Sequence, residues 1–276
     1  MKNPGRPVAG RLAMVLAGLL PGSHERQRPY DTDTLLDERA WWHASAHLHE
    51  IREFVDHWSG NRDLDCLDLF SPKGRIKKVW GARGKTAVNY DIKSGGKQHD
   101  VSGRVGCMFL LAFILRLKPG AMVMAGPPCS LFIYLSSSIH QRRVGLEEGD
   151  VRHHSVRLAN LIVANMMVLL QIAHSRGVFF VLEQPSTSWM FKMLVVVAAF
   201  EGMGTAVVPR VTTWMRAFGH EIPKCSHLVG TLPTLHFMRR SLNTRLVPRV
   251  TSYALWARTA AGGIQALAKH LRNCGR

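Results

Sequence analysis

The segment AMVMAGPPC, residues 121–129, decides the fold class. Its first five residues are all apolar, which is typical of a strand buried on both faces of a parallel sheet. Glycine and two prolines end the strand and place Cys129 on the loop after it. On either side of this segment, short apolar runs alternate with stretches of helical periodicity. This pattern predicts further strands at 66–70, 87–91 and 178–182, and helices at 76–83, 105–117 and 151–175. This pattern indicates an α/β fold, a Rossmann-like sheet with flanking helices.

The chain divides near residue 63. Residues 1–62 form an N-terminal extension, in which apolar residues at helical spacing predict one amphipathic helix over 34–58. An apolar stretch behind basic residues leaves a leader over 1–25 as an alternative. Residues 63–276 form the α/β domain, and its later part is predicted as a strand at 206–215, a hairpin or loop at 219–230 and a closing helix at 260–272.

Positive charge is concentrated in the α/β domain. The 276 residues carry a formal net charge of +17, but residues 1–63 hold 8 basic and 9 acidic side chains, whereas 64–276 hold 28 and 10. Such an excess predicts a polyanionic partner, either nucleic acid or an anionic membrane surface. If phosphate contacts dominate, the affinity for nucleic acid falls steeply with salt.

The cysteine spacing and the hydropathy of the chain bear on its cellular compartment and on whether it spans a membrane. Five widely spaced cysteines without a C-x-x-C pair indicate neither a disulfide framework nor a zinc ribbon. We therefore predict an intracellular protein, in the nucleus or nucleoid, or in an organelle if the leader is real. No charge-free apolar run reaches eighteen residues, so no transmembrane segment is predicted.

Polar residues follow the predicted strands, where ligands bind in open α/β sheets. The turn from Phe70 to Gly74 leads into a helix whose N-terminal amides can hold the polar part of a cofactor. Asp91 ends the next strand at the spacing of a ribose-binding carboxylate, although such a residue is more often a turn or cap residue. Asp100, placed beyond a third short strand, could accept the exocyclic amine of an adenine. Together they imply an adenosine-shaped ligand.

Two further strand ends supply candidate catalytic groups. Cys129 follows the rigid Gly-Pro-Pro sequence, and Arg142 or Arg143 could favour its thiolate, although a single cysteine is more often a small buried hydrophobe. Glu183 ends the strand at 178–182, where a carboxylate needs a hydrogen-bonding role. We expect Cys129 and Glu183 to flank one pocket.

The order of these residues resembles the C5-cytosine DNA methyltransferases over roughly residues 64–232. The resemblance rests on the segments LDLF (67–70), YD (90–91), HDV (99–101), GPPCS (126–130) and EQPS (183–186). It implies a class I methyltransferase fold with S-adenosylmethionine as cofactor. Cys129 would add to C6 of a flipped cytosine and Glu183 would hydrogen-bond its N3 and N4 groups. The cofactor-binding residues would be Phe70, Gly74, Asp91, Asp100 and Pro128, and the substrate-binding residues Arg142, Arg143 and Arg210.

The sequence also departs from the family. Pro72 and Arg75 occupy two glycine positions of the cofactor loop, and only Gly74 remains. Arg210 is, by position alone, the nearest candidate for the arginine that contacts cytosine O2. The C-terminal stretch is too short for a full target-recognition region, so little sequence specificity is expected.

The alternatives differ in the role of Cys129. A catalytically weak or inactive relative would keep the sheet and the basic surface as a nucleic-acid-binding module, with DNA favoured over RNA in either case. A cysteine hydrolase would need a histidine at another strand end, which is lacking. No metal site is predicted. The His43–His47 pair lacks a third ligand of defined spacing, and the segment that holds His220, Cys225 and His227 also resembles one that follows the glutamate motif in phage-like members of the family.

Overall fold

The computed structural model describes residues 51, 53–203, 208–218 and 223–241. The predicted leader, most of the predicted helix over 34–58 and the closing helix at 260–272 lie outside these residues. Residues 53–56 are helical, and Ile51 and Val55 are buried in the main core. The end of the predicted N-terminal helix therefore packs against the α/β domain.

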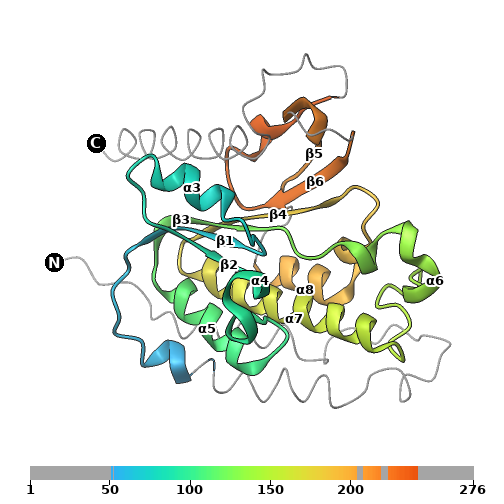
Figure 1. The fold of residues 1–276 in the computed structure, drawn as a ribbon, viewed down its shortest axis with the longest axis horizontal. Helices are drawn as coiled ribbons and strands as arrows, with labels where there is room; N and C mark the ends of the chain where they lie inside the picture. The colour runs from blue at the N-terminus through green and yellow to red at the C-terminus, as the bar shows by residue number, and fades with distance from the viewer. Residues whose placement is uncertain (1–50, 52, 204–207, 219–222, 242–276) are drawn as a thin grey trace.

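A six-stranded mixed sheet forms the centre of the described chain (Figure 1). Its strands are β1 (Leu64–Leu69), β2 (Ala87–Tyr90), β3 (Leu117–Ala125), β4 (Phe179–Pro185), β5 (Arg210–Trp214) and β6 (Cys225–Gly230), in the spatial order β2-β1-β3-β4-β6-β5. The strands β1 to β4 run parallel to one another, whereas β6 runs antiparallel to both β4 and β5. The alternation of strands and helices is consistent with a Rossmann-like fold.

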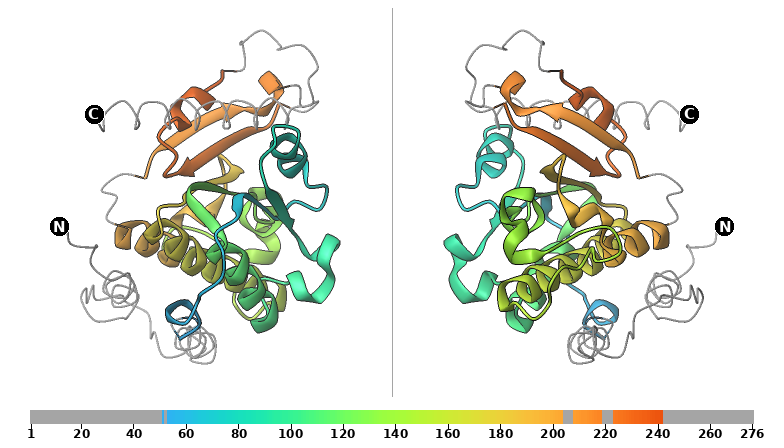
Figure 2. Two further views of the ribbon diagram at one scale, coloured as in Figure 1. Left: turned by 90° about the vertical axis from the view of Figure 1, so that its left-hand side faces the viewer. Right: turned by 90° about the vertical axis from the view of Figure 1, so that its right-hand side faces the viewer.

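Helices cover both faces of this sheet, as the turned views show (Figure 2). The helices are α3 (Arg75–Gly81), α4 (Ile92–Gly95), α5 (Arg104–Leu115), α6 (Ser137–His140), α7 (His154–Ser175) and α8 (Leu194–Gly202). In β3, Val123 and Ala125 belong to the larger core, beneath α5, α7 and α8, while Met122 and Met124 belong to the smaller core on the α3 face. This burial on both faces explains why the sequence of β3 is a continuous apolar run.

The longest helix, α7, is long and apolar enough to cross a membrane by length and composition alone. However, 56% of its most apolar window is buried inside the protein. Met166, Leu169 and Leu170 belong to the main core, so α7 packs as a central helix of an α/β domain.

The third strand predicted before Asp100 does not form. Residues 92–99 instead make α4 and a 3₁₀ helix, Gly96–His99. Asp91 favours this outcome because its side chain accepts a hydrogen bond from the Lys93 amide and caps α4. The hydroxyl of Tyr90 then donates to the Gln98 carbonyl, which fixes the segment against the sheet. Asp100 therefore follows a 3₁₀ helix and precedes α5.

The C-terminal strands also differ in extent from the prediction. β4 continues through Pro185 because Glu183, Gln184 and Pro185 pair with residues 226–228 of β6. Glu183 is therefore inside the strand rather than after it. Within the predicted segment 219–230, Cys225–Gly230 forms strand β6, and Arg210–Trp214 of the predicted 206–215 strand forms β5. Residues 206, 207 and 219–222 lie outside the described residues.

Candidate functional site

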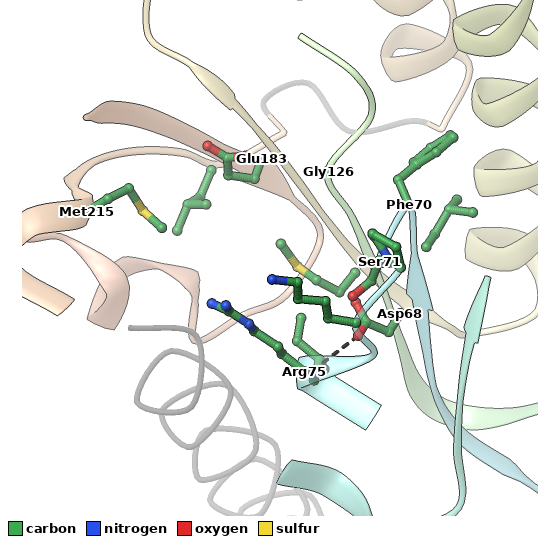
Figure 3. A pocket seen from close by; sticks show the side chains of 13 residues that line it. Asp68, Phe70, Ser71, Arg75, Gly126, Glu183 and Met215 are labelled. Carbon is green, nitrogen blue, oxygen red and sulfur yellow. Dashed lines mark hydrogen bonds between the residues drawn. The ribbon is translucent and has the colours of Figure 1, made fainter. Parts of the chain in front are cut away.

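A cavity of about 300 Å³ opens at the carboxyl ends of β1, β3 and β4 (Figure 3). This is the edge of the sheet where the sequence predicted a ligand. Thirteen residues line the cavity: Asp68, Leu69, Phe70, Ser71, Pro72, Lys73, Arg75, Ile76, Met124, Gly126, Glu183, Met215 and Leu228. Phe70 lies on the side opposite Glu183 and Met215, and Asp68, Ser71 and Arg75 come from β1, from the turn after it and from the start of α3.

The turn between β1 and α3 is tightly built. Phe70 has a φ of 60° and Gly74 a φ of 54°, both in the left-handed region. Asn89 donates a hydrogen bond to the Ser71 carbonyl at 3.2 Å, and a Cβ added to Gly74 would lie 3.2 Å from the Asn89 Cγ. Gly74 therefore suits this turn for its conformation and for its lack of a side chain. Phe70, which has a Cβ, holds a strained backbone where it lines the cavity.

Asp68 is a site residue that the sequence analysis missed. It is only 3% exposed, and its Oδ2 accepts hydrogen bonds from the amides of Ile76 and Lys77 at 3.1 and 3.4 Å. Burial raises the pKa of this carboxyl to about 6, despite these hydrogen bonds. The signal in the sequence was an aspartate between two leucines within an apolar strand.

The raised pKa of Asp68 predicts a stability that depends on pH. The folded protein binds this proton more tightly than the unfolded chain, whose aspartate has its ordinary pKa of 3.8. The Asp68 contribution to the free energy of unfolding, about 3 kcal/mol, is therefore fully present below the unfolded pKa of 3.8 and is lost as the pH rises through the folded pKa of about 6. We expect Asp68→Asn to remove this part of the pH dependence.

Urea denaturation of both proteins between pH 4 and pH 7 measures this effect. The other titrating groups contribute to both proteins, so the difference between the two free energies of unfolding isolates Asp68. A difference that does not change with pH would contradict the assignment.

The predicted cofactor acids, Asp91 and Asp100, both have local hydrogen-bonding roles. Asp91 Oδ1 accepts from the Lys93 amide at 2.7 Å. Asp100 Oδ1 accepts from the amide and hydroxyl of Ser102 at 3.0 and 2.6 Å. Neither residue lines the cavity. The capping role that the sequence left open for Asp91 is therefore present, and the contacts of both with a cofactor stay predictions.

Glu183 lies at the meeting point of three strands. A Cβ added to Gly126 would be 3.8 Å from Glu183 Oε2, so the carboxylate is beside the residue that begins the Gly-Pro-Pro-Cys loop. On its other side, Oε1 lies 3.1 Å from the ammonium Nζ of Lys224, just before β6. The sequence analysis named Glu183 but did not identify Lys224 as its partner, because the pairing of β4 with β6 is not local.

The loop that carries Cys129 is attached to β4 by a buried hydrogen bond. Gln184 Nε2 donates to the Pro127 carbonyl at 2.6 Å, and Ser188 donates to Gln184 Oε1 at 3.0 Å. Cys129 is partly exposed after the exposed Pro128, and neither lines the cavity. Of the two residues that were expected to flank one pocket, Glu183 lines this cavity and Cys129 does not, although its loop lies next to β4.

The three predicted substrate arginines have different surroundings. Arg142 is 5% exposed, and its guanidinium donates to the Leu131 and Glu147 carbonyls and to Asn160 Oδ1. Burial lowers its pKa to about 10. These are the contacts of a structural arginine that holds the loop after Cys129. Arg143 and Arg210 are exposed.

No family model matches this chain, and a search of curated proteins also found no match. Among the described residues there is no group of three or more His, Cys, Asp or Glu side chains that could hold a metal ion. His43, His47 and His220 lie outside those residues.

Proposed function

We propose that this protein is a class I S-adenosylmethionine-dependent methyltransferase that transfers a methyl group to C5 of cytosine in DNA. One observation carries the proposal: a single cavity is lined by the β1–α3 turn, by Glu183 and by Gly126, which begins the cysteine loop. The resemblance rests on five segments, and three of them, 67–70, 126–130 and 183–186, contribute residues to this cavity. A basic chain of net charge +17 suits a nucleic-acid partner.

The sheet supports the finer fold assignment. The sheet of class I methyltransferases is mostly parallel. The last strand of the chain runs antiparallel and lies in space between the two strands that precede it in the sequence. In this chain β6 occupies that position between β4 and β5. The segment 92–99, where a further edge strand would be expected, forms α4 and a 3₁₀ helix instead.

The N-terminus of α3 disfavours a phosphate group at its amides. In dinucleotide-binding folds the first helix N-terminus binds a pyrophosphate. Here the Asp68 carboxylate accepts two of the α3 amides and would repel a phosphate. S-adenosylmethionine carries a positive sulfonium and no phosphate, and it supplies an electrophilic methyl group when bound. At about 300 Å³ the cavity is at the small end of small-molecule sites. Phe70 and Gly74 would form the turn beneath the cofactor, with Asp91, Asp100 and Pro128 around it.

The protein groups would then activate the base. Cytosine C5 is a poor nucleophile, and addition of the Cys129 thiolate to C6 would place the electron pair of the 5,6 double bond on C5, which takes the methyl group. Loss of the C5 proton to a base would then restore the double bond and release the thiolate. Glu183 would accept a hydrogen bond from the exocyclic amine and hold the ring. The base must leave the duplex to reach both groups. Tyr134 and Leu135, which follow Cys129 and are 79% and 89% exposed, are suited to insertion where the base has left.

The β1–α3 turn favours a second candidate, a nucleic-acid-binding module without activity. Lys73 and Arg75 line the cavity, and Pro72 and Arg75 stand where the family has glycines. Bulkier residues at this turn oppose a close backbone approach to a cofactor. The two candidates differ in whether the protein binds S-adenosylmethionine.

Titration calorimetry with S-adenosylmethionine and S-adenosylhomocysteine tests the proposal. We expect micromolar binding to the parent protein and methyl transfer to cytosine-containing DNA. Asp91→Asn retains an acceptor for the Lys93 amide but loses the charge, whereas Asp91→Ala loses both. If Asp91 binds the ribose, we expect about tenfold weaker binding in Asp91→Asn and a greater loss in Asp91→Ala. Absence of cofactor binding by the parent would favour the inactive module.

A further inference from the structure

We propose that the outer side of α3, the turn after it and α4 form one surface that binds the phosphate backbone of nucleic acid. This surface, the α3–α4 surface, is made of eight basic residues: Lys73, Arg75, Lys77, Lys78, Arg83, Lys85, Lys93 and Lys97. It requires neither a cofactor nor a cytosine. The inference therefore goes beyond the proposed function and applies to the enzyme and to the inactive module alike.

Positive charge is dense and exposed in this part of the chain. Residues 69–99 hold eight basic side chains and one acidic side chain, and all eight basic residues are exposed. The one acid is Asp91, whose carboxylate accepts the Lys93 amide and caps α4. This segment therefore contributes +7 to the chain's net charge of +17.

The sequence of α3 separates an apolar side from a basic side. Ile76 and Trp80, four residues apart, are 2% and 3% exposed and belong to the smaller core. Lys77 and Lys78 lie on the outer side of the helix and are exposed. A Cβ added to Gly81, the next residue on that side, would meet no atom within 4 Å. The outer side of α3 is therefore open to a partner.

Strand β2 joins the two helices into one surface. Asn89 in β2 accepts a hydrogen bond from Lys77 Nζ at 3.4 Å, and its amide group donates to Ser94 Oγ in α4 at 3.3 Å. Both helices lie at the β2 edge of the sheet (Figure 2). Lys73 and Arg75 also line the cavity, so the surface begins at the cavity. A nucleic acid bound along it would pass the cavity mouth.

The acidic side chains of β1, which lies beneath α3, do not neutralise the surface. Asp65 Oδ1 is 3.1 Å from Lys118 Nζ, and its Oδ2 accepts from the Thr86 amide at 2.9 Å. Asp68 is 3% exposed and accepts amides of α3. Both carboxylates are engaged within the fold, so the surface keeps its positive potential.

The surface suits a phosphate backbone better than an anionic membrane. A helix that lies in a membrane interface needs apolar residues on its membrane side, whereas Ile76 and Trp80 face the core. Among residues 69–99, all of which the structure describes, Ile92 is the one large apolar side chain that is exposed. The surface therefore offers charge with little apolar area to insert.

The dimensions of α3 match the spacing of phosphates. A helix of seven residues is about 10 Å long, and one strand of duplex DNA presents about three phosphates over that length. Contacts with phosphates position a protein without reading the sequence. Such a surface would supply affinity to a chain that is too short for a full target-recognition region.

The experiment measures binding of a duplex made only of A·T base pairs, by fluorescence anisotropy over a series of salt concentrations. This probe contains no cytosine, so binding does not depend on the proposed reaction. The test variant is Lys77→Gln/Lys78→Gln. The control, Arg62→Gln/Lys192→Gln, removes the same charge from exposed positions before β1 and before α8.

We expect the test variant to bind the duplex at least about tenfold more weakly than the parent at about 0.1 M salt. The slope of log affinity against log salt should fall by about two, because each phosphate contact contributes about 0.9. The control should stay within about threefold of the parent, with nearly the same slope. Urea denaturation should give all three proteins the same free energy of unfolding, since the substituted side chains are exposed.

The outcomes separate this inference from the proposed function. Unchanged affinity and slope in the test variant, or an equal loss in both variants, would refute the α3–α4 surface and leave the methyltransferase proposal standing. Loss of binding to phosphatidylserine vesicles, with duplex binding unchanged, would assign the surface to a membrane instead. A parent that binds no S-adenosylmethionine, together with the expected loss in the test variant, would refute the methyltransferase and support the surface.

Discussion

Replacement of Cys129 by serine is expected to lower methyl transfer at least about a thousandfold and to abolish the covalent adduct with 5-fluorocytosine. A serine hydroxyl does not ionise near neutral pH, so it cannot replace the thiolate. The substitution changes one atom at a partly exposed position, so we expect S-adenosylmethionine and DNA to bind as they do to the parent.

The four described cysteines provide internal controls. Cys66 and Cys107 are buried, and burial raises the pKa of the Cys107 thiol to about 11 and that of Cys66 well above its ordinary value. These two are unsuited to act as nucleophiles. Cys225 is partly exposed like Cys129 but lies in β6, so Cys225→Ser is the matched control.

Denaturing electrophoresis of protein with a 5-fluorocytosine duplex and S-adenosylmethionine measures the adduct. We expect it in the parent and in Cys225→Ser, and not in Cys129→Ser. An adduct that persists in Cys129→Ser, or that is lost only in Cys225→Ser, would assign the nucleophile elsewhere.

The strands could be predicted because their signal is local. Parallel strands covered by helices on both faces appear as short apolar runs, and β1 to β4 were each found within a few residues. The extension of β4 through Glu183 could not be found this way, because it depends on pairing with β6, more than forty residues later. The ion pair with Lys224 depends on the same non-local pairing.

Polar residues were harder to interpret than apolar ones. Asp91 was identified as the end of β2, but its side chain also caps α4, and this local hydrogen bond competes with a third strand. Arg142 was expected to meet the substrate, yet it is buried over the ring of Phe132. Its acceptors include Asn160 in α7, and no spacing along the sequence indicates that contact. Asp68 was missed because its burial depends on α3 folding back over β1.

The turn between Asp100 and α5 leads to a prediction about stability. Gly106, in the first turn of α5, packs directly on the backbone of Asp100. A Cβ at this position would lie 2.5 and 2.7 Å from the Asp100 C and N atoms and would overlap its carbonyl oxygen. The hydroxyl of Tyr90 also lies within hydrogen-bond distance of the Gly106 carbonyl, so its single proton is shared between the Gln98 and Gly106 carbonyls. The helix therefore has no room to shift without breaking a buried contact.

We expect Gly106→Ala to lower the free energy of unfolding by about 3 kcal/mol, even though alanine favours helix by about 1 kcal/mol over glycine. Gly81→Ala in α3 is the control, because a Cβ there meets no atom within 4 Å. Its effect should be neutral or slightly stabilising. Urea denaturation of the three proteins measures both changes. A loss below 1 kcal/mol in Gly106→Ala would mean that α5 and the Asp100 turn can separate.

Because Asp100 is also expected beside the adenine, we predict weaker S-adenosylmethionine binding in the same variant, measured by calorimetry at a temperature where it is still folded.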